Sequence, residues 1–121
     1  MSDIEQFVTR YLAAWNETDP ARRRAEIDAV WADDALYIDP LVVARGREEI
    51  DATIGAVQAQ FPGFVFRLAG PVDAHHQQAR FQWELGPAGG EALVVGFDVA
   101  VLAEDGRIGQ VYGFLDKVPA A

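Results

Sequence analysis

The sequence ALVVGFDVAVLA at residues 92–103 decides the fold class of this chain. Apolar side chains stand at almost every position, which is typical of a strand that is covered on both faces. The turn sequence EDGR follows at residues 104–107, and residues 108–117 then continue as a second strand. Successive side chains of a strand point to opposite faces. The two faces of the first strand are therefore predicted to carry Val94, Gly96, Asp98, Ala100 and Leu102 on one side, and Leu93, Val95, Phe97, Val99 and Val101 on the other.

Two further strands precede this pair. Apolar and polar residues alternate over residues 64–68 and again over residues 79–85, which indicates two half-buried strands. Residues 86–90 are rich in glycine and form a loop. Residues 35–39 are a short strand that ends at Pro40. These segments predict one antiparallel sheet.

Three helices are predicted in the first half of the chain. Apolar residues recur at helical spacing over residues 3–16. Asp19 followed by Pro20 is a helix start, because aspartate caps the first turn and proline fits its first position. That helix is expected to end near residue 31. A third helix follows Gly46 and ends before residues 62–63. The order of helices and strands predicts one α+β domain over residues 1–121, with the helices on one face of the sheet.

The strand at residues 92–103 also bears on assembly. If the helices cover only one face of the sheet, the apolar side chains of the other face need a second cover. A second subunit is the simplest cover, so we expect a homodimer that forms through the sheet. The alternative is that strand curvature buries both faces within one chain.

Composition excludes several classes of function. The 121 residues carry a net charge of −9, which disfavours contact with nucleic acids and anionic lipids. The chain has no cysteine, so disulfides and thiolate chemistry are impossible. Residues 1–6 lack the pattern of a signal peptide, and no apolar run is long enough to span a bilayer. We expect a cytoplasmic protein without nucleic-acid or membrane partners.

The chain lacks the usual motifs of metal and nucleophilic catalysis. His75 and His76 are adjacent, so in a strand they would point to opposite faces and would not bind one ion together. They are expected to lie near a hairpin turn. The only serine is Ser2, and no Gly-x-Ser-x-Gly sequence is present. We expect neither a metal nor another cofactor.

Three residues are candidates for chemistry. Asp98 lies within an apolar strand, where a carboxyl is costly unless it is hydrogen-bonded or wet, and where burial raises its pKa. The alternative is an outward-facing Asp98. Asp39 precedes Pro40, which makes it either a placed carboxylate or an ordinary turn residue. Tyr11 lies on the apolar stripe of the first helix and brings its hydroxyl into the core, where it needs a partner even if its role is only packing.

Several short motifs resemble one known superfamily. The sequences RYLAAWN at residues 10–16, WADDA at 31–35 and DP at 39–40 are similar in order and spacing to the opening of the ketosteroid isomerases. GREEI at residues 46–50 resembles the start of the third helix in SnoaL-like proteins. FD at 97–98 with DGRI at 105–108 resembles an isomerase hairpin. The likeness to the SnoaL-like, nuclear transport factor 2-like (NTF2-like) superfamily implies a cone-shaped, cystatin-like α+β barrel, whose curved antiparallel sheet holds three helices on its concave face.

The resemblance also implies roles for the three candidates. By position, Asp39 matches the general base of the isomerases, while Tyr11 and Asp98 match the pair that binds the developing oxyanion. Ketosteroid isomerase is the standard case of a carboxylic acid kept neutral so that it donates a hydrogen bond. The substrate would be a small hydrophobic molecule, and the expected pocket walls are Trp15, Phe61, Trp83, Tyr112 and Phe114.

Two functions follow from this likeness. The first is an isomerase or polyketide-cyclase-like enzyme that transfers a proton next to a carbonyl group. The second is a non-catalytic module that binds a small ligand or a protein, because the superfamily hosts both. The related limonene epoxide hydrolases use an Asp-Arg-Asp set, but the nearest candidate here, Arg80, is expected to point away from the apolar face.

Overall fold

A computed structural model describes residues 3–119 of the chain. Ser2 and the other terminal residues lie outside the described part. The described part contains three helices and six strands, in the order α1 (Asp3–Asn16), α2 (Pro20–Val30), β1 (Trp31–Asp39), β2 (Val42–Arg45), α3 (Gly46–Gln60), β3 (Phe64–His75), β4 (Gln78–Pro87), β5 (Val94–Leu102) and β6 (Ile108–Lys117).

The helices begin where the sequence predicts them. The Asp19 carboxylate accepts a hydrogen bond from the backbone N–H of Arg22 at 2.9 Å, and Pro20 occupies the first helical position of α2. At the start of α3, Glu49 accepts a bond from the N–H of Arg45 at 2.9 Å. The bounds predicted for α1 are confirmed, while α2 ends at Val30 because Trp31 already has the extended backbone of β1.

The six strands form one sheet in the order β2-β1-β6-β5-β4-β3. All pairs are antiparallel except β1 with β6, which is parallel. The prediction of a wholly antiparallel sheet is therefore wrong. Helix α3 carries the chain from β2 at one edge to β3 at the other, and the meander of β3 to β6 returns beside β1 in the same direction. The sequence also did not predict the short edge strand β2.

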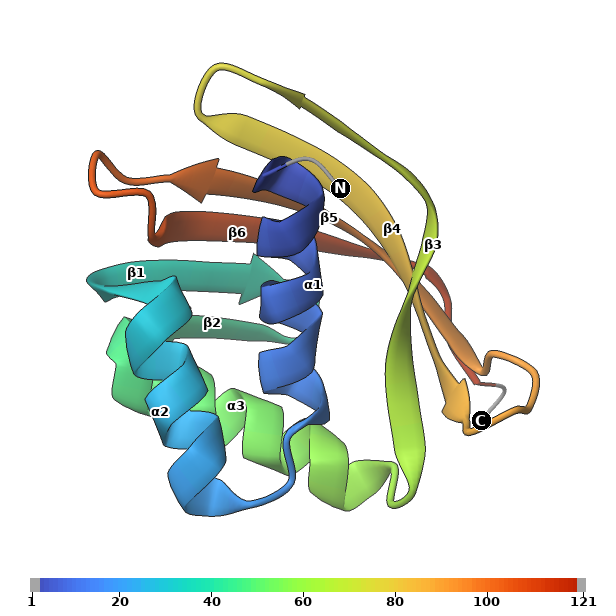
Figure 1. Ribbon diagram of the computed structural model, residues 1–121. Helices are drawn as coiled ribbons and strands as arrows, with labels where there is room; N and C mark the ends of the chain where they lie inside the picture. The colour runs from blue at the N-terminus through green and yellow to red at the C-terminus, as the bar shows by residue number, and fades with distance from the viewer. Residues whose placement is uncertain (1–2, 120–121) are drawn as a thin grey trace.

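The sheet is curved and stays open, with all three helices on its concave side (Figure 1). α1 lies in the hollow of the sheet, and α2 and α3 lie beside the end formed by β1 and β2. This is consistent with the cone-shaped α+β fold that the resemblance implies. The opposite, convex side of β5 and β6 carries no helix.

The alternation of side chains along β5 places the carboxyl of Asp98 in the core. The inward residues Val94, Gly96, Asp98 and Ala100 are buried as alternation predicts, with Asp98 at 2% exposure, while Leu102 at the end of the strand is half-buried. Gly96 is required on the same face, because a Cβ there would overlap the indole ring of Trp83. The residues of β5 on the convex side are only half-buried.

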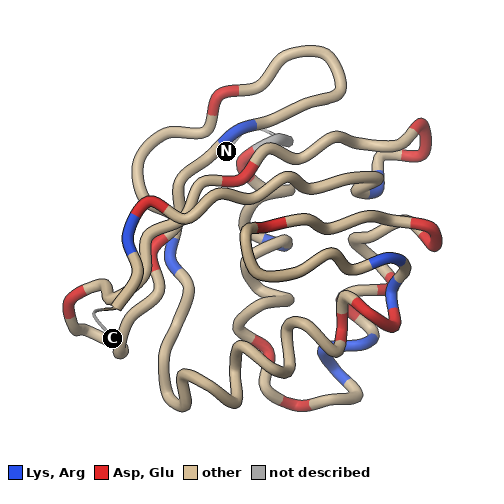
Figure 2. The backbone as a smooth tube through the Cα atoms, turned by 180° about the vertical axis from the view of Figure 1, so that it is seen from behind, with Lys and Arg blue, Asp and Glu red and all other residues tan. Residues whose placement is uncertain are grey.

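Acidic and basic positions both occur along the backbone around α2 and α3 (Figure 2). Arg23, from the basic triplet at residues 22–24, pairs with Asp51 at 2.7 Å, and Arg24 pairs with Asp28 at 3.0 Å. Arg23 therefore links α2 to α3 by an ion pair, and Arg24 forms an ion pair within α2. Within residues 3–119, none of the helices has both the length and the apolar character needed to cross a membrane.

Candidate active site

A cavity of about 320 Å³ lies between α1, α3 and the concave face of the sheet. This volume is in the range of small-molecule pockets. Its walls are mostly apolar and aromatic, and its polar groups are few. The residues that line it include Tyr11, Trp15, Tyr37, Asp39, Leu41, Gln60, Phe61, Phe66, Trp83, Asp98 and Leu115.

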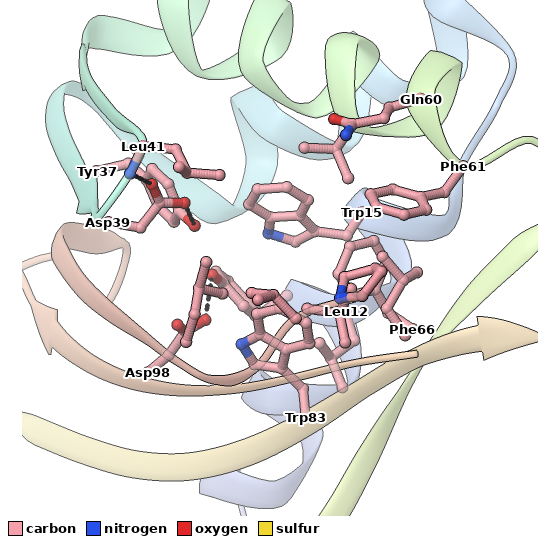
Figure 3. Close-up of a pocket in the computed structure, with 17 residues that line it drawn as sticks. Leu12, Trp15, Tyr37, Asp39, Leu41, Gln60, Phe61, Phe66, Trp83 and Asp98 are labelled. Atoms are coloured by element: carbon pink, nitrogen blue, oxygen red, sulfur yellow. Dashed lines mark hydrogen bonds between the residues drawn. The ribbon is translucent and has the colours of Figure 1, made fainter. Parts of the chain in front are cut away.

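The cavity brings together the three residues that the sequence singles out. The hydroxyl of Tyr11 on α1 donates a hydrogen bond to Oδ2 of Asp98 on β5, at 2.8 Å. Asp39 at the end of β1 lines the same cavity. Figure 3 shows Asp39 and Asp98 on one side of the cavity, with Gln60 and Phe61 at the other end. One end of the cavity therefore carries the ionisable groups.

Asp98 is a buried carboxyl of the described core. Burial raises the pKa of Asp98 to about 6, and the nearby charge of Asp39 adds to the rise, while hydrogen bonding from Tyr11 and Trp83 opposes it. Its second oxygen, Oδ1, is buried and has no hydrogen-bond partner. A neutral Asp98 would place a proton on one of its oxygens and so become a donor.

The two tyrosines beside it remain neutral phenols. Burial raises the pKa of Tyr11 well above its ordinary value, and the adjacent Asp98 and Tyr37 raise it further. Burial likewise raises the pKa of Tyr37, with Asp98 and Asp39 as the next causes. The site therefore holds protonated hydroxyl groups close to its carboxyls.

Asp39 is held in place by three donors. Its Oδ2 accepts a hydrogen bond from the hydroxyl of Tyr37 at 2.8 Å. Its Oδ1 accepts bonds from the backbone N–H groups of Leu41 at 2.8 Å and Val42 at 3.0 Å. A carboxylate has about four acceptor positions, so about one remains for a further proton donor. The turn at Pro40 points the backbone N–H groups of Leu41 and Val42 toward the side chain of Asp39. The Asp-Pro sequence thereby fixes the orientation of this carboxylate.

Of the five predicted wall residues, the structure brings three to the cavity. Trp15, Phe61 and Trp83 line it (Figure 3). The indole N–H of Trp15 is buried without a hydrogen-bond partner. These rings form an apolar enclosure around the polar end.

Tyr112 and Phe114 do not line the cavity, so their placement as walls is wrong. They lie on the convex side of β6, where their exposures are 36% and 56%. The inward positions of β6 belong to Val111, Gly113 and Leu115. Both faces of β6 carry apolar residues. A register shift between β5 and β6, at Val101 and Leu102 of β5, decides which face of β6 turns inward.

Tyr37 and Gln60 also line the cavity, although neither was predicted as a site residue from the sequence. A signal for Tyr37 exists, because residues two apart in a strand share a face and Tyr37 therefore faces the same way as Asp39. Gln60 gives no comparable signal. It ends α3, and only the tertiary fold brings it to the cavity.

The histidines lie far from these groups, at the turn between β3 and β4. Both are exposed, and His76 adopts a positive φ of 52° in that turn. This confirms their expected place. Arg80 also points outward, as expected, and pairs with Asp73 at 3.2 Å. In the part of the chain that the structure describes, no group of three or more histidine, aspartate or glutamate side chains is arranged to hold a metal ion.

Comparison with known proteins agrees with this architecture. Residues 8–111 match the SnoaL-like domain family. A candidate isomerase of the SnoaL-like family from Agrobacterium tumefaciens is 43% identical, with 92% of this chain and 95% of that chain covered at a TM-score of 0.88. No curated protein matches the chain.

More distant solved structures share the fold alone. A candidate SnoaL-like polyketide cyclase from Jannaschia sp. is 19% identical, with 96% of this chain and 90% of that chain covered at a TM-score of 0.71. A protein with a cystatin-like fold from Silicibacter pomeroyi is 21% identical, with 90% and 72% covered at a TM-score of 0.66. The family match over most of the chain and the 43% identical relative together show that this chain belongs to the SnoaL-like domain family.

Proposed function

We propose that this protein is an acid–base enzyme that transfers a proton next to a carbonyl group of a small hydrophobic substrate. The reaction would be an isomerisation or an aldol-type cyclisation. Asp39 acts as the general base, and Tyr11 with Asp98 stabilises the enolate oxygen. The observation that carries this proposal is that one cavity holds two carboxyls in contrasting surroundings, Asp39 among donors and Asp98 in a desolvated site.

The contrast suits the two halves of the reaction. Abstracting a proton from carbon needs a basic carboxylate near that carbon. The oxygen of the same substrate gains negative charge and needs neutral donors that already point at it. Two carboxyls in one cavity, one held by hydrogen-bond donors and the other desolvated, support such an assignment of base and acid.

The hydrogen bond between Tyr11 and Asp98 supplies the donors in our mechanism. When Asp98 is neutral, its O–H donates to the phenol oxygen of Tyr11, and the bond seen at 2.8 Å is reversed. The Tyr11 O–H is then free to donate to a substrate oxygen. Asp98 thus strengthens the Tyr11 donor through a short chain of hydrogen bonds.

The carboxylate of Asp39 then carries the proton during the reaction. Asp39 takes a proton from the carbon next to the carbonyl, and the C–H electron pair becomes the enolate. In an isomerisation, Asp39 returns the proton to a different carbon of the conjugated system. In a cyclisation, the enolate carbon instead attacks a second carbonyl of the same substrate, whose C=O electron pair moves to its oxygen, and that alkoxide takes the proton held by Asp39. The relative described as a candidate isomerase supports the first outcome, and the one described as a candidate polyketide cyclase supports the second.

Binding of an enolate mimic tests this assignment. We would titrate 2-naphthol into the wild type and into the variants Tyr11→Phe, Asp98→Asn and Asp39→Asn, following fluorescence. We expect Tyr11→Phe and Asp98→Asn to bind the naphtholate anion about tenfold more weakly, as loss of one strong donor implies. Equal binding by all four proteins would contradict the assignment.

A second function is a binding module without catalysis. The observation that favours it is the set of three hydrogen bonds that already occupies most of the acceptor positions of Asp39. In that case Asp39 shapes the loop at residues 40–42 and does not act on the ligand. Ligand affinity would then be the same for wild type and Asp39→Asn, and no proton exchange on the ligand would occur.

We also propose that the protein forms a homodimer through the convex side of its sheet. No described helix covers that side (Figure 1), although neighbouring strands carry apolar side chains there. We name this surface the convex patch; strand pairing places on it Ile38, Val43, Phe97, Val99, Tyr112 and Phe114. A second copy laid on this patch would bury Tyr112 and Phe114, and aromatic side chains are enriched in the centres of interfaces.

A further inference from the structure

Gly113 of β6 lies between the two carboxyl-bearing residues of the cavity. It is paired with Asp98 across β5 and β6. A Cβ added at Gly113 would lie 2.9 Å from Oδ1 of Asp98 and 3.3 Å from Cβ of Asp39. The first distance is too short for a real contact, so a side chain here would displace the Asp98 carboxyl. The backbone at Gly113 thus lies close to the side chains of both Asp98 and Asp39.

We propose that Gly113 is a positioning residue for Asp98. The missing side chain lets the Asp98 carboxyl rest against the backbone of β6 while its other oxygen meets the hydroxyl of Tyr11. Any substituent at residue 113 would rotate the carboxyl away from β6 and break this hydrogen bond. Residue 113 therefore sets the geometry of the acid and acts through Asp98 without touching the substrate.

The surroundings leave the carboxyl little room to move elsewhere. Asp98 is 2% exposed. The titratable groups that face it are Tyr11 from α1 and Tyr37 and Asp39 from β1. The neighbouring hollow over Gly96 is already filled by the ring of Trp83. Of the two glycine positions on this part of the inner face, one accommodates an indole ring and the other accommodates the Asp98 carboxyl.

Gly109 on the same strand provides a matched control. A Cβ at Gly109 would have its nearest neighbours at 3.5 Å and 3.7 Å, the carbonyl oxygen of Val101 and the backbone nitrogen of Ala103. These are ordinary contacts. Neither Gly109 nor Gly113 has a positive φ, so the backbone accepts alanine at both positions. The two substitutions therefore differ in the close contacts that a Cβ at residue 113 makes with Asp98 and with Asp39, and removal of the Asp98 side chain separates the two.

The first experiment is a double-mutant cycle on stability, which does not depend on the proposed function. Urea unfolding would be measured for wild type, Gly113→Ala, Asp98→Ala and the double variant. We expect Gly113→Ala to lower the unfolding midpoint in the wild type and to lower it much less when Asp98 is alanine. Gly109→Ala is expected to have the same small effect in both backgrounds.

Each outcome of the cycle decides the proposal. If Gly113→Ala fails to fold while the double variant folds, the conflict is with Asp98 and the proposal stands. Gly113→Ala could lower the unfolding midpoint equally with Asp98 and with alanine at residue 98, or the double variant could also fail to fold. In either case the added Cβ clashes with Asp39 or with the backbone. The proposal is then overturned.

The second experiment rests on the proposed function, because it measures recognition of a carbonyl. Affinities for 2-acetylnaphthalene and naphthalene would be compared in one buffer at pH 6. We expect Gly113→Ala to retain naphthalene binding and to lose the preference for the ketone by about tenfold, whereas Gly109→Ala retains both. Wild-type affinity for the ketone in Gly113→Ala would overturn the positioning role. A wild type without any preference for the ketone would contradict the proposed function, and the stability cycle would still decide the role of Gly113.

Discussion

The hydroxyl of Tyr11 lies 2.8 Å from Oδ2 of Asp98, and the two residues stand 87 positions apart in the chain. This contact joins the first helix to the central strand of the sheet inside the cavity. It pairs a phenol with a carboxyl that burial makes hard to ionise. The protonation state of Asp98 therefore affects the stability of the fold as well as the donors offered to a ligand.

Stability is expected to fall as Asp98 ionises. Its pKa is about 6 in the folded protein and 3.8 ordinarily, so the folded state binds more protons between these values. Unfolding then becomes easier as pH rises through this window, by about 3 kcal/mol in total. Asp98→Asn removes the effect.

Urea unfolding of wild type and Asp98→Asn at pH 5 and pH 8 measures this contribution. The difference between the two proteins isolates Asp98 from other titrating groups. We expect the wild type to lose about 1.5 kcal/mol relative to Asp98→Asn between these pH values. An unchanged difference would mean that Asp98 ionises as readily in the folded as in the unfolded chain.

Recognition of a ketone is expected to weaken above pH 6. Neutral Asp98 is needed for the donor chain through Tyr11, and the neutral fraction falls about tenfold per pH unit above its pKa. The affinity for 2-acetylnaphthalene, which does not itself ionise, should follow this fraction in the wild type. In Asp98→Asn the amide does not ionise and is a weaker donor than a carboxylic acid, so the affinity is expected to be lower than that of the wild type at pH 6 and independent of pH. A flat profile in the wild type would exclude neutral Asp98 as part of the donor chain.

Asn16 at the end of α1 is expected to hold the helix against the sheet. Its side-chain amide donates to the carbonyl of Phe66 at 3.0 Å and accepts from the N–H of Phe66 at 2.7 Å. Asn16→Ala removes both bonds and should lower the free energy of unfolding by about 1 to 2 kcal/mol. Thr9→Ala, at an exposed position of the same helix, is the control and should change it by less than about 0.5 kcal/mol. Equal effects would show that the Asn16 bonds contribute no net stability.

Charge on the convex patch is expected to separate the proposed dimer. Phe114→Glu places a carboxylate at an exposed position of the patch, whereas Leu68→Glu places one at an exposed position on the concave side, since Leu68 pairs with the inward-facing Trp83. Sedimentation velocity should show a dimer for wild type and Leu68→Glu and a monomer for Phe114→Glu. A monomeric wild type, or a dimeric Phe114→Glu, would contradict a dimer through this face.

Local sequence signals predict the helices and the inward face of β5. Asp19-Pro20 defines the start of α2, and alternation places Asp98 on the side of the helices. These features depend on neighbouring residues, so a single sequence contains the needed information. The sequence also singles out Tyr11, Asp39 and Asp98 one by one with an alternative left open for each, and the resemblance to the ketosteroid isomerases groups them in one site.

Features that depend on tertiary pairing were not predictable in this way. β2 has only four residues and forms because the Asp39 turn folds it back onto β1. The parallel pairing of β1 with β6 depends on the crossover through α3. Both faces of β6 carry apolar residues, so the sequence does not show which face turns inward. The register shift between β5 and β6 decides that Tyr112 lies on the convex side. Alternation alone does not distinguish the two faces of such a strand.

The most direct test of the proposed chemistry is exchange of the protons next to the carbonyl of 2-tetralone in D₂O, followed by NMR. This small ketone reports proton abstraction without knowledge of the natural substrate. We expect the wild type to accelerate exchange over buffer and Asp39→Asn to lose this acceleration by about 100-fold or more, in line with removal of a general base, while remaining folded. No acceleration by the wild type, or equal acceleration by Asp39→Asn, would contradict the assignment of Asp39 as the base.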